Sequence, residues 1–227
     1  MRWEHLLFAH WQVPPASLSS LLPRGVTLDL HEGAAWLGVV PFRMSWVRPR
    51  RLPAAPWASF FPELNVRTYV LVNGIPGVWF FSLDAANPLA VWGARRWFHL
   101  PYFHARMRCA EHEGWVHYSS RRTHRNAPPA EFAARYRPTG DPRPAEQDSL
   151  EAWLVERYCL YSADPQGRLY RGAIQHIPWP LQPAELEIER CEMTALLGLK
   201  LPETPPLAHF ARRIDVNAWS LDAAAAS

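Results

Sequence analysis

Lysine is almost absent from this chain. Of its 24 basic residues only Lys200 is a lysine, so the other 23 are arginines. Any reaction that needs a lysine amine therefore has one candidate in 227 residues. The net charge of +3 is small and the arginines are scattered, whereas a nucleic-acid binder concentrates basic residues on one face. We expect no nucleic-acid partner.

Cysteine is also scarce, with three residues that form no C-x-x-C pair: Cys109, Cys159 and Cys191. Their number and spacing argue against a disulfide scaffold and favour a reducing, cytoplasmic compartment. No apolar run reaches about 18 residues, so we expect no membrane span. A glutamate and two histidines interrupt the first eleven residues, which excludes the apolar stretch of a signal peptide.

The rest of the composition is that of a folded protein. Hydrophobic residues make up 48% and charged residues 20%, which excludes a disordered tail. The length fits one large domain, and the proline-rich stretch 137–148 is too short to separate two. We expect a single domain over residues 1–222 and a frayed tail over 223–227, where alanines dominate.

Short runs with a period of two, typical of strands, dominate from Trp36 onward. Pro41 inside the first run implies an edge strand or a bulge. An Asn-Gly turn at Asn73 joins the second and third runs as a hairpin. The expected strands are Trp36–Val47, Leu64–Asn73, Val78–Leu83, His104–Cys109, Trp115–Arg121, Arg168–Ile177 and Glu185–Glu192.

Helices are predicted to be few and short. One helix is expected over Pro14–Leu22, between a proline at its start and Pro23 after its end. Asp148 or Ser149 caps a second helix, which runs to about Tyr158. A last helix is expected around Pro206–Arg213. Ala130–Tyr136 fits either a helix or a strand. The pattern as a whole predicts a mainly β (α+β) domain.

The segment FPELNVRTYVLV is the most informative one. On a strand, alternation places Glu63, Asn65, Arg67 and Tyr69 on one face. That face either lies in water, as is common for antiparallel sheets, or lines a buried pocket. The apolar neighbouring strand and the mixture of polar groups favour burial. Buried charges need partners, so we then expect Glu63 and Arg67 to form a couple.

Further candidate residues lie outside this strand. Arg95 and Arg96 suit an anion, although exposed rim arginines are the alternative. His176, before a rigid Pro-Trp-Pro, is a possible site residue, but a packed core histidine is the favoured interpretation. Histidines recur five residues apart without an H-E-x-x-H motif, so we expect no metal site.

Seven motifs together resemble the bacterial YqjF-like family, a domain of unknown function (DUF2071) related to acetoacetate decarboxylases. They are FAHW at Phe8–Trp11, AWLGVVPF at Ala35–Phe42, PELNVRTYV at Pro62–Val70, GVWFFSLDA at Gly77–Ala85, the ARR…PY run at Ala94–Tyr102, ERYCLY at Glu156–Tyr161 and HIPWPLQ at His176–Gln182. The resemblance implies an acetoacetate-decarboxylase-like β-barrel or curved, mostly antiparallel sheet with a central polar cavity. It also implies that Ala130–Tyr136 is a strand.

The decarboxylase relatives carry two adjacent lysines after a glycine, one of which forms a Schiff base, and a pocket glutamate. Arg95 and Arg96, after Gly93, occupy the place of that pair, and Glu63 matches the glutamate. A guanidinium stays protonated and is no carbonyl nucleophile, so Schiff-base decarboxylation is not expected. Lys200 lies outside the matching motif.

The leading hypothesis is therefore a pocket for a small anionic or carbonyl-bearing molecule, without a cofactor. Arg95 or Arg96 would hold the anion, and Tyr69 and Tyr102 would donate hydrogen bonds. Whether the protein is an enzyme is open: Glu63 is the best general acid or base for a lyase or hydrolase. A non-enzymatic sensor or carrier, a structural or partner-binding protein, and a homo-oligomer stay open as well.

Overall fold

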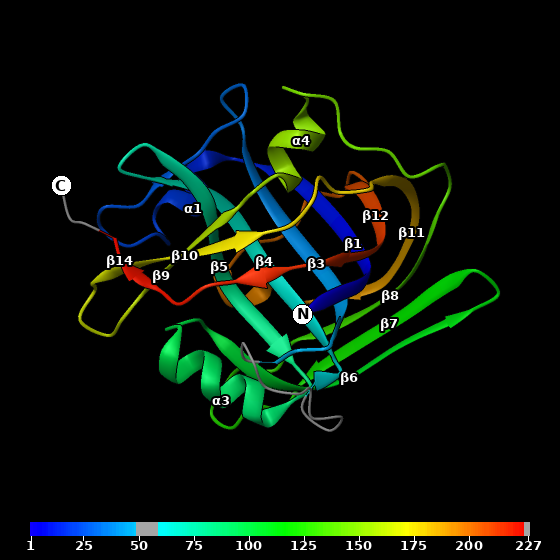
Figure 1. The fold of residues 1–227 in the computed structure, drawn as a ribbon, viewed down its shortest axis with the longest axis horizontal. Coiled ribbons are helices and arrows are strands. Elements are labelled where there is room, and N and C mark those ends of the chain that lie inside the picture. Colours follow the sequence, from blue (N-terminus) through cyan, green and yellow to red (C-terminus); the bar gives the residue numbers. More distant parts are fainter. Residues whose placement is uncertain (49–58, 225–227) are drawn as a thin grey trace.

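The computed structural model describes residues 1–48 and 59–224 (Figure 1). Helices are short: α1 (Pro15–Ser19), α3 (Pro88–Trp97), α4 (Leu150–Val155) and the 3-10 turn Ala195–Leu197. The strands are β1 (Arg2–Val13), β2 (Thr27–Leu28), β3 (Ala35–Ser45), β4 (Phe61–Val72), β5 (Ile75–Ala85), β6 (Tyr102–His112), β7 (Trp115–Arg122), β8 (Glu131–Pro138), β9 (Cys159–Ala163), β10 (Leu169–Gln175), β11 (Gln182–Cys191), β12 (Leu207–Asp215), β13 (Asn217–Ala218) and β14 (Asp222–Ala223).

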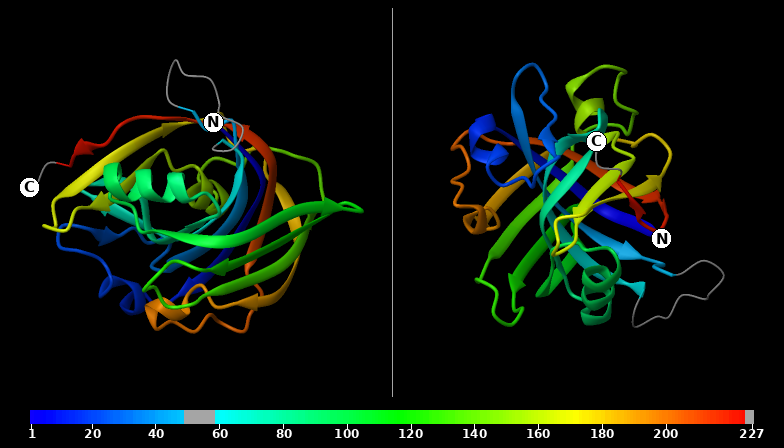
Figure 2. Two further views of the ribbon diagram at one scale, coloured as in Figure 1. Left: turned by 90° about the horizontal axis from the view of Figure 1, so that it is seen from below. Right: turned by 90° about the vertical axis from the view of Figure 1, so that its left-hand side faces the viewer.

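Nine strands close into a barrel. The order β5–β6–β7–β8–β11–β12–β1–β3–β4 returns to β5, because β4 also pairs with β5. All these pairs are antiparallel except β5–β6. Beyond β5 the sheet continues through β9 and β10. Figure 2 shows the strands curving around the interior of the barrel, with α3 at one end of it. The expected mainly β, acetoacetate-decarboxylase-like barrel with a few short helices is confirmed.

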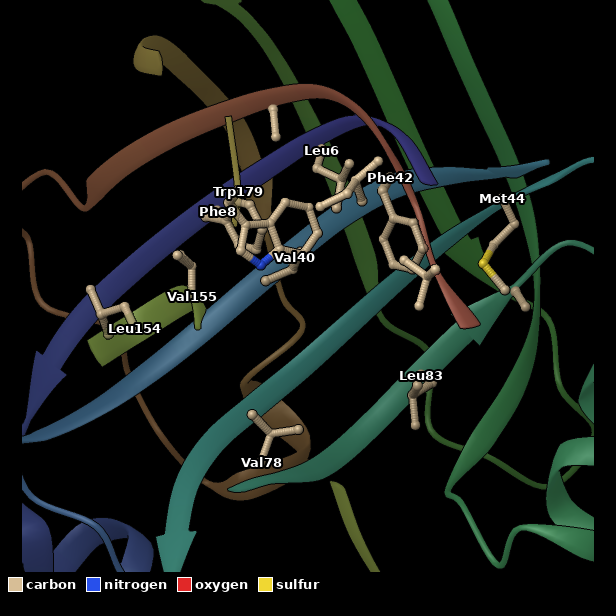
Figure 3. Close-up of a cluster of buried hydrophobic side chains, with 14 of the residues drawn as sticks. Leu6, Phe8, Val40, Phe42, Met44, Val78, Leu83, Leu154, Val155 and Trp179 are labelled. Carbon is tan, nitrogen blue, oxygen red and sulfur yellow. The ribbon is translucent and has the colours of Figure 1, made fainter. Parts of the chain in front are cut away.

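Strands β1, β3 and β4 form a wall with an apolar core on each face, because alternate residues point to opposite sides. On one face, the first core includes Phe8, Val40 and Tyr69 from the wall, and α4 and Trp179 cover it (Figure 3). On the other face, the second core packs against β7 and β8. The wall is buried on both sides, so its strands carry few exposed residues.

The expected strands all form, within a few residues of their predicted ends. Strand β3 pairs with β1 on one side and β4 on the other, so Pro41 marks a bulge rather than an edge. The β1–β3 register shifts between Glu4 and Ala9, opposite Pro41, where His5 has a positive φ of 53°. Ala130–Tyr136 lies mostly in strand β8, as the family resemblance implies.

The helix predicted around Pro206–Arg213 is wrong, because that segment is strand β12. Its side chains alternate between the two cores, and it pairs with β1 over eight residues. This long-range pairing outweighs the local helix propensity. The other two predicted helices form over shorter spans, and α4 begins after Ser149, whose side chain accepts a hydrogen bond from the Ala152 amide.

Strand β14 lies near the C-terminus and pairs with β10. The frayed tail was expected from residue 223, but Ala223 pairs with Tyr170 in β14. Residues 225–227 of that tail lie outside the described residues. Within the described ranges, none of the helices combines the length and the apolar character that crossing a membrane requires.

Candidate functional site

The polar face of β4 is buried. Glu63, Asn65, Arg67 and Tyr69 are exposed by 4%, 5%, 9% and 0%. They point to the same side as Phe61, toward the first core. Of the two interpretations of this face, the structure therefore agrees with the buried one. Ionisable groups held out of water in this way are typical of functional sites.

Glu63 hydrogen-bonds to a tyrosine from another strand. The Tyr102 hydroxyl, at the start of β6, donates to Glu63 Oε2 at 2.8 Å. Burial raises the pKa of Glu63 from 4.5 to about 8, and the Tyr102 hydrogen bond opposes the rise. At neutral pH this carboxyl is therefore mostly protonated. It can donate a proton as well as accept one.

Arg67 lies at the other end of the same face. One of its Nη atoms donates to the Leu154 carbonyl of α4 at 3.3 Å, and its guanidinium lies over the rings of Phe8 and Tyr69 at 5.5 and 5.8 Å. Within the described part of the chain, no carboxylate lies within ion-pairing distance of it. Arg67 is thus a buried cation held by a carbonyl and two ring faces.

The predicted couple between Glu63 and Arg67 does not form. Four residues along an extended strand separate their Cα atoms by roughly 13 Å. Each side chain instead turns toward a different neighbour, Tyr102 and Leu154. Asn65 lies between them. Its buried Oδ1 has no hydrogen-bond partner in the described part of the chain, and neither has Nε of Arg67.

His10 of β1 extends the cluster across the wall. Its Nε2 lies 2.7 Å from the Tyr69 hydroxyl, and both side chains are buried. Burial, Arg67 and His209 lower the pKa of His10 well below its usual value, so the imidazole is neutral. Gly38 of β3 lies between His10 and Arg67, and a Cβ there would approach His10 Cδ2 to 3.0 Å. Glycine makes room for both side chains.

Arg157, just after α4, adds a second guanidinium. Its Nη1 lies 2.6 Å from Asp29 Oδ2, and the guanidinium carbon Cζ of Arg157 lies 5.0 Å from the centre of the Tyr69 ring. The two arginines thus share Tyr69, but only Arg157 has a carboxylate partner. Sequence reasoning missed Arg157, His10 and Gly38 as site residues. All three lie in motifs that carry the family resemblance, which was the available signal.

Arg95 and Arg96 lie at the C-terminal end of helix α3, rather than on a strand or in a loop, and both are exposed. Neither lies in the buried cluster. Arg95 contacts it from outside, because its Nη1 donates to the Tyr102 carbonyl at 2.7 Å. His176 is half-buried and packs between the rings of Tyr158 and Trp179, which fits the favoured interpretation as a packed histidine.

The described residues contain no group of three or more side chains suited to hold a metal ion. The surface hollows beside Gln12 and beside Arg108 are lined by neither Glu63 nor Arg67. Leu154 and Val155 of α4 and Trp179 belong to the same apolar core as Tyr69, and the Leu154 carbonyl contacts the Arg67 end of the cluster. Its chemistry is that of a neutral carboxyl, a buried cation and unpartnered polar atoms.

This fold is the acetoacetate decarboxylase fold. The chain is similar to the acetoacetate decarboxylase from Legionella pneumophila, with a TM-score of 0.61, 14% identity and coverage of 98% of this chain and 88% of that one. It is also similar to the enduracididine biosynthesis enzyme MppR complexed with pyruvate, with a TM-score of 0.67, 10% identity and coverage of 99% and 89%. Identities this low support the fold alone.

The family follows from closer relatives. The model of the family DUF2071, described as "Uncharacterized conserved protein", matches residues 1–215. The protein YqjF of Bacillus subtilis (strain 168) is 47% identical over 219 residues, which are 96% of this chain and 89% of that protein. The chain therefore belongs to the DUF2071 family, as the seven motifs indicate.

Proposed function

We propose that the buried cluster binds a small anionic or carbonyl-bearing molecule. The observation that carries the proposal is Arg67, a buried cation with no carboxylate partner among the described residues, on one face with a Glu63 that is neutral at pH 7. A buried charge is costly unless it is paired, and a ligand carboxylate would supply the missing partner. The pyruvate named with MppR is an anion of this kind.

The ligand would lie along β4. Its carboxylate meets Arg67, and a carbonyl oxygen or hydroxyl reaches Glu63 and Tyr102, with the Asn65 amide in between. Because the four side chains are buried and α4 contacts Arg67, we expect entry of a ligand to require a movement of α4. The main chain of Leu154 is the contact that such a movement would break first, since it bonds to Arg67 itself.

The proposal includes the absence of Schiff-base decarboxylation. The side chain of Lys200 is 88% exposed, and its Nζ lies 3.8 Å from Glu203 Oε1. It therefore lacks the burial that activates such amines, and its ion-pair partner is a carboxylate. Treatment with acetoacetate and borohydride should leave the intact mass unchanged. A stable adduct on Lys200 would contradict this part of the proposal.

Pyruvate and acetoacetate are the probes for binding, measured by titration calorimetry at pH 7. Arg67→Met should weaken binding about tenfold or more, since it removes the charged donor. Arg96→Met removes one exposed charge and should change affinity less than about twofold. The opposite ranking would place the anion at α3. A thermal melt verifies folding, and Arg67→Gln replaces the Met variant if that one unfolds.

A second candidate function is a lyase or hydrolase in which Glu63 is the general acid or base. The raised pKa of about 8 favours it, because proton transfer is most efficient when the pKa is near the working pH. Keto acids and lactones should then be turned over, with an inflection near pH 8 that Glu63→Gln abolishes. Ligand retained unchanged through native mass spectrometry supports a sensor or carrier instead.

The remaining expectations belong to this proposal as well. We propose a cytoplasmic protein that works without cofactor and without nucleic acid, and we leave a homo-oligomer open. A structural or partner-binding role would have been favoured by exposure of Glu63, Asn65 and Arg67. All three are buried, so the small-molecule proposal is the better supported one.

A further inference from the structure

A second candidate site lies on the outer face of the barrel, far in sequence from β4. A hollow with a volume of about 620 Å³ opens over β6, β7, β8 and β11. We call it the outer hollow. Its lining residues are Arg106, Met107, Arg108, Ser119, Ser120, Arg121, Glu131, Phe132, Ala133, Glu189 and Arg190. A volume of this size is typical of sites for small molecules.

Strand register explains the shape of the outer hollow. Arg108 of β6 pairs with Ser119 of β7, which pairs with Ala133 of β8, which pairs with Arg190 of β11. Small side chains therefore form the centre of this row, and arginines stand at both ends. In the neighbouring row, Arg106 pairs with Arg121.

The charges in the outer hollow are unbalanced. Four arginines face two glutamates among its lining residues. Glu131 lies 3.4 Å from Arg121 and 2.7 Å from Arg190, so it is already shared. Within the described ranges, Arg106 and Arg108 have no carboxylate within ion-pairing distance. Both are exposed and lie on the same outward face of β6.

The same sheet shows what an ordinary arrangement looks like. Farther along β8, Arg135 and Arg137 pair with Glu187 and Glu185 of β11 at 2.8 and 2.6 Å. In the outer hollow, by contrast, Arg106 lies directly opposite Arg121, and like charges in that position destabilise a sheet. An arrangement that costs stability and leaves donors free is typical of a binding site.

We propose that the outer hollow binds a small molecule that carries a phosphate group. Guanidinium groups present planar forks that match phosphate oxygens, and the Ser119 hydroxyl adds a donor at the centre of the row. Several donors around one point suit a phosphate better than a planar carboxylate. No exposed aromatic ring lies among the lining residues, so the stacking platform of a nucleic-acid site is missing there.

Titration calorimetry with inorganic pyrophosphate tests this site on the full chain. Arg108→Ala should weaken binding about tenfold, because it removes a charged donor without breaking an ion pair. Arg135→Ala is the control: it removes the same charge from the same sheet, at an arginine that is already paired with Glu187, and should change affinity less than about twofold. Both residues point outward, and a thermal melt verifies that each variant folds.

Two further arms separate phosphate recognition from attraction by charge alone. Ser119→Ala leaves the charge unchanged and should still weaken pyrophosphate binding several-fold. Citrate should bind more weakly than pyrophosphate. The proposal is overturned by equal effects of the two arginine variants, by equal affinity for citrate, or by no binding at about 1 mM. A single-stranded oligonucleotide that displaces pyrophosphate at a lower concentration would overturn it as well. Arg67→Met should not affect this titration, so the two sites are distinguished.

Discussion

Glu63 shows how one buried residue makes stability depend on pH. In the folded state its pKa is about 8, against an ordinary value of 4.5. Between these two values the folded protein keeps a proton that the unfolded chain has lost. The contribution to stability is therefore fully present below about pH 4.5 and falls as the pH rises to about 8. At about 1.4 kcal/mol per pKa unit, the loss has an upper limit on the order of 5 kcal/mol.

Glu63→Gln should remove this dependence, because an amide does not titrate and still accepts the Tyr102 hydrogen bond. We expect the free energy of unfolding of the variant to exceed that of the native chain increasingly from pH 5 to pH 9. Urea unfolding at both pH values measures the difference. The exposed Glu185→Gln is the control and should leave the slope unchanged. Parallel curves for Glu63→Gln and the native chain would show that Glu63 is not buried as described.

The shared face of β4 could be predicted from the sequence because it depends only on the strand itself. Alternation along one strand is a local rule, so the shared face of Glu63, Asn65 and Arg67 followed from it. The same rule should have excluded the predicted ion pair, since residues four apart on a strand are too distant. Arg157 and His10 come from other elements, and only the fold brings them to Tyr69.

At the scale of elements, a helix can be predicted from residues at its own end, whereas a strand can depend on a partner far away in the sequence. Helix α3 has a local signal that was missed: Asn87 caps it by accepting hydrogen bonds from Leu89 N and Ala90 N, and Pro88 follows as its first residue. This helix turns Arg95 and Arg96 outward, so neither side chain lies in the buried cluster. The strand identity of β12, by contrast, depends on β1, which is about 200 residues away in sequence.

Strands β5 and β9 approach each other closely at Gly77. Gly77 lies where the two strands run parallel, and a Cβ there would come within 2.7 Å of Tyr161 Cε2 and 2.9 Å of the Cys159 carbonyl oxygen. The carbonyl belongs to the backbone of β9, so it cannot rotate away. The glycine is thus required by close approach rather than by its backbone angles.

Gly77→Ala should lower the free energy of unfolding by about 2–3 kcal/mol, because the added methyl forces β9 away from β5. Urea unfolding measures the loss. Gly140→Ala is the control: its nearest neighbour is a side-chain atom of Pro183 at 3.3 Å on the exposed surface, and we expect a change of less than about 0.5 kcal/mol. Equal stability of Gly77→Ala and the native chain would mean that the β5–β9 junction is not closely packed.

At the scale of the whole molecule, closure of the barrel depends on a short seam. Strands β5 and β6 are paired over only three residue pairs, from Leu83–Tyr102 to Ala85–His104. Asp84 of β5 reinforces this seam from inside, since its carboxylate accepts hydrogen bonds from Arg122 of β7 at 2.7 and 3.0 Å. The ion pair therefore joins the two strands that flank β6. Both side chains are almost fully buried.

Asp84→Asn should destabilise the fold by about 3–5 kcal/mol, because it leaves the Arg122 charge buried without its partner. The double variant Asp84→Leu with Arg122→Met should lose less than the single one, since no unpaired charge remains. Urea unfolding ranks the two, with Glu187→Gln at an exposed pair as a control that costs at most about 1 kcal/mol.

Tyr102 lies in the same seam. Opening the β5–β6 pairing therefore also removes the Tyr102 hydrogen bond to Glu63, and we expect the Asp84→Asn variant to bind ligand more weakly as well as to be less stable. A double variant as unstable as the single one would show that packing, not the unpaired charge, controls the seam.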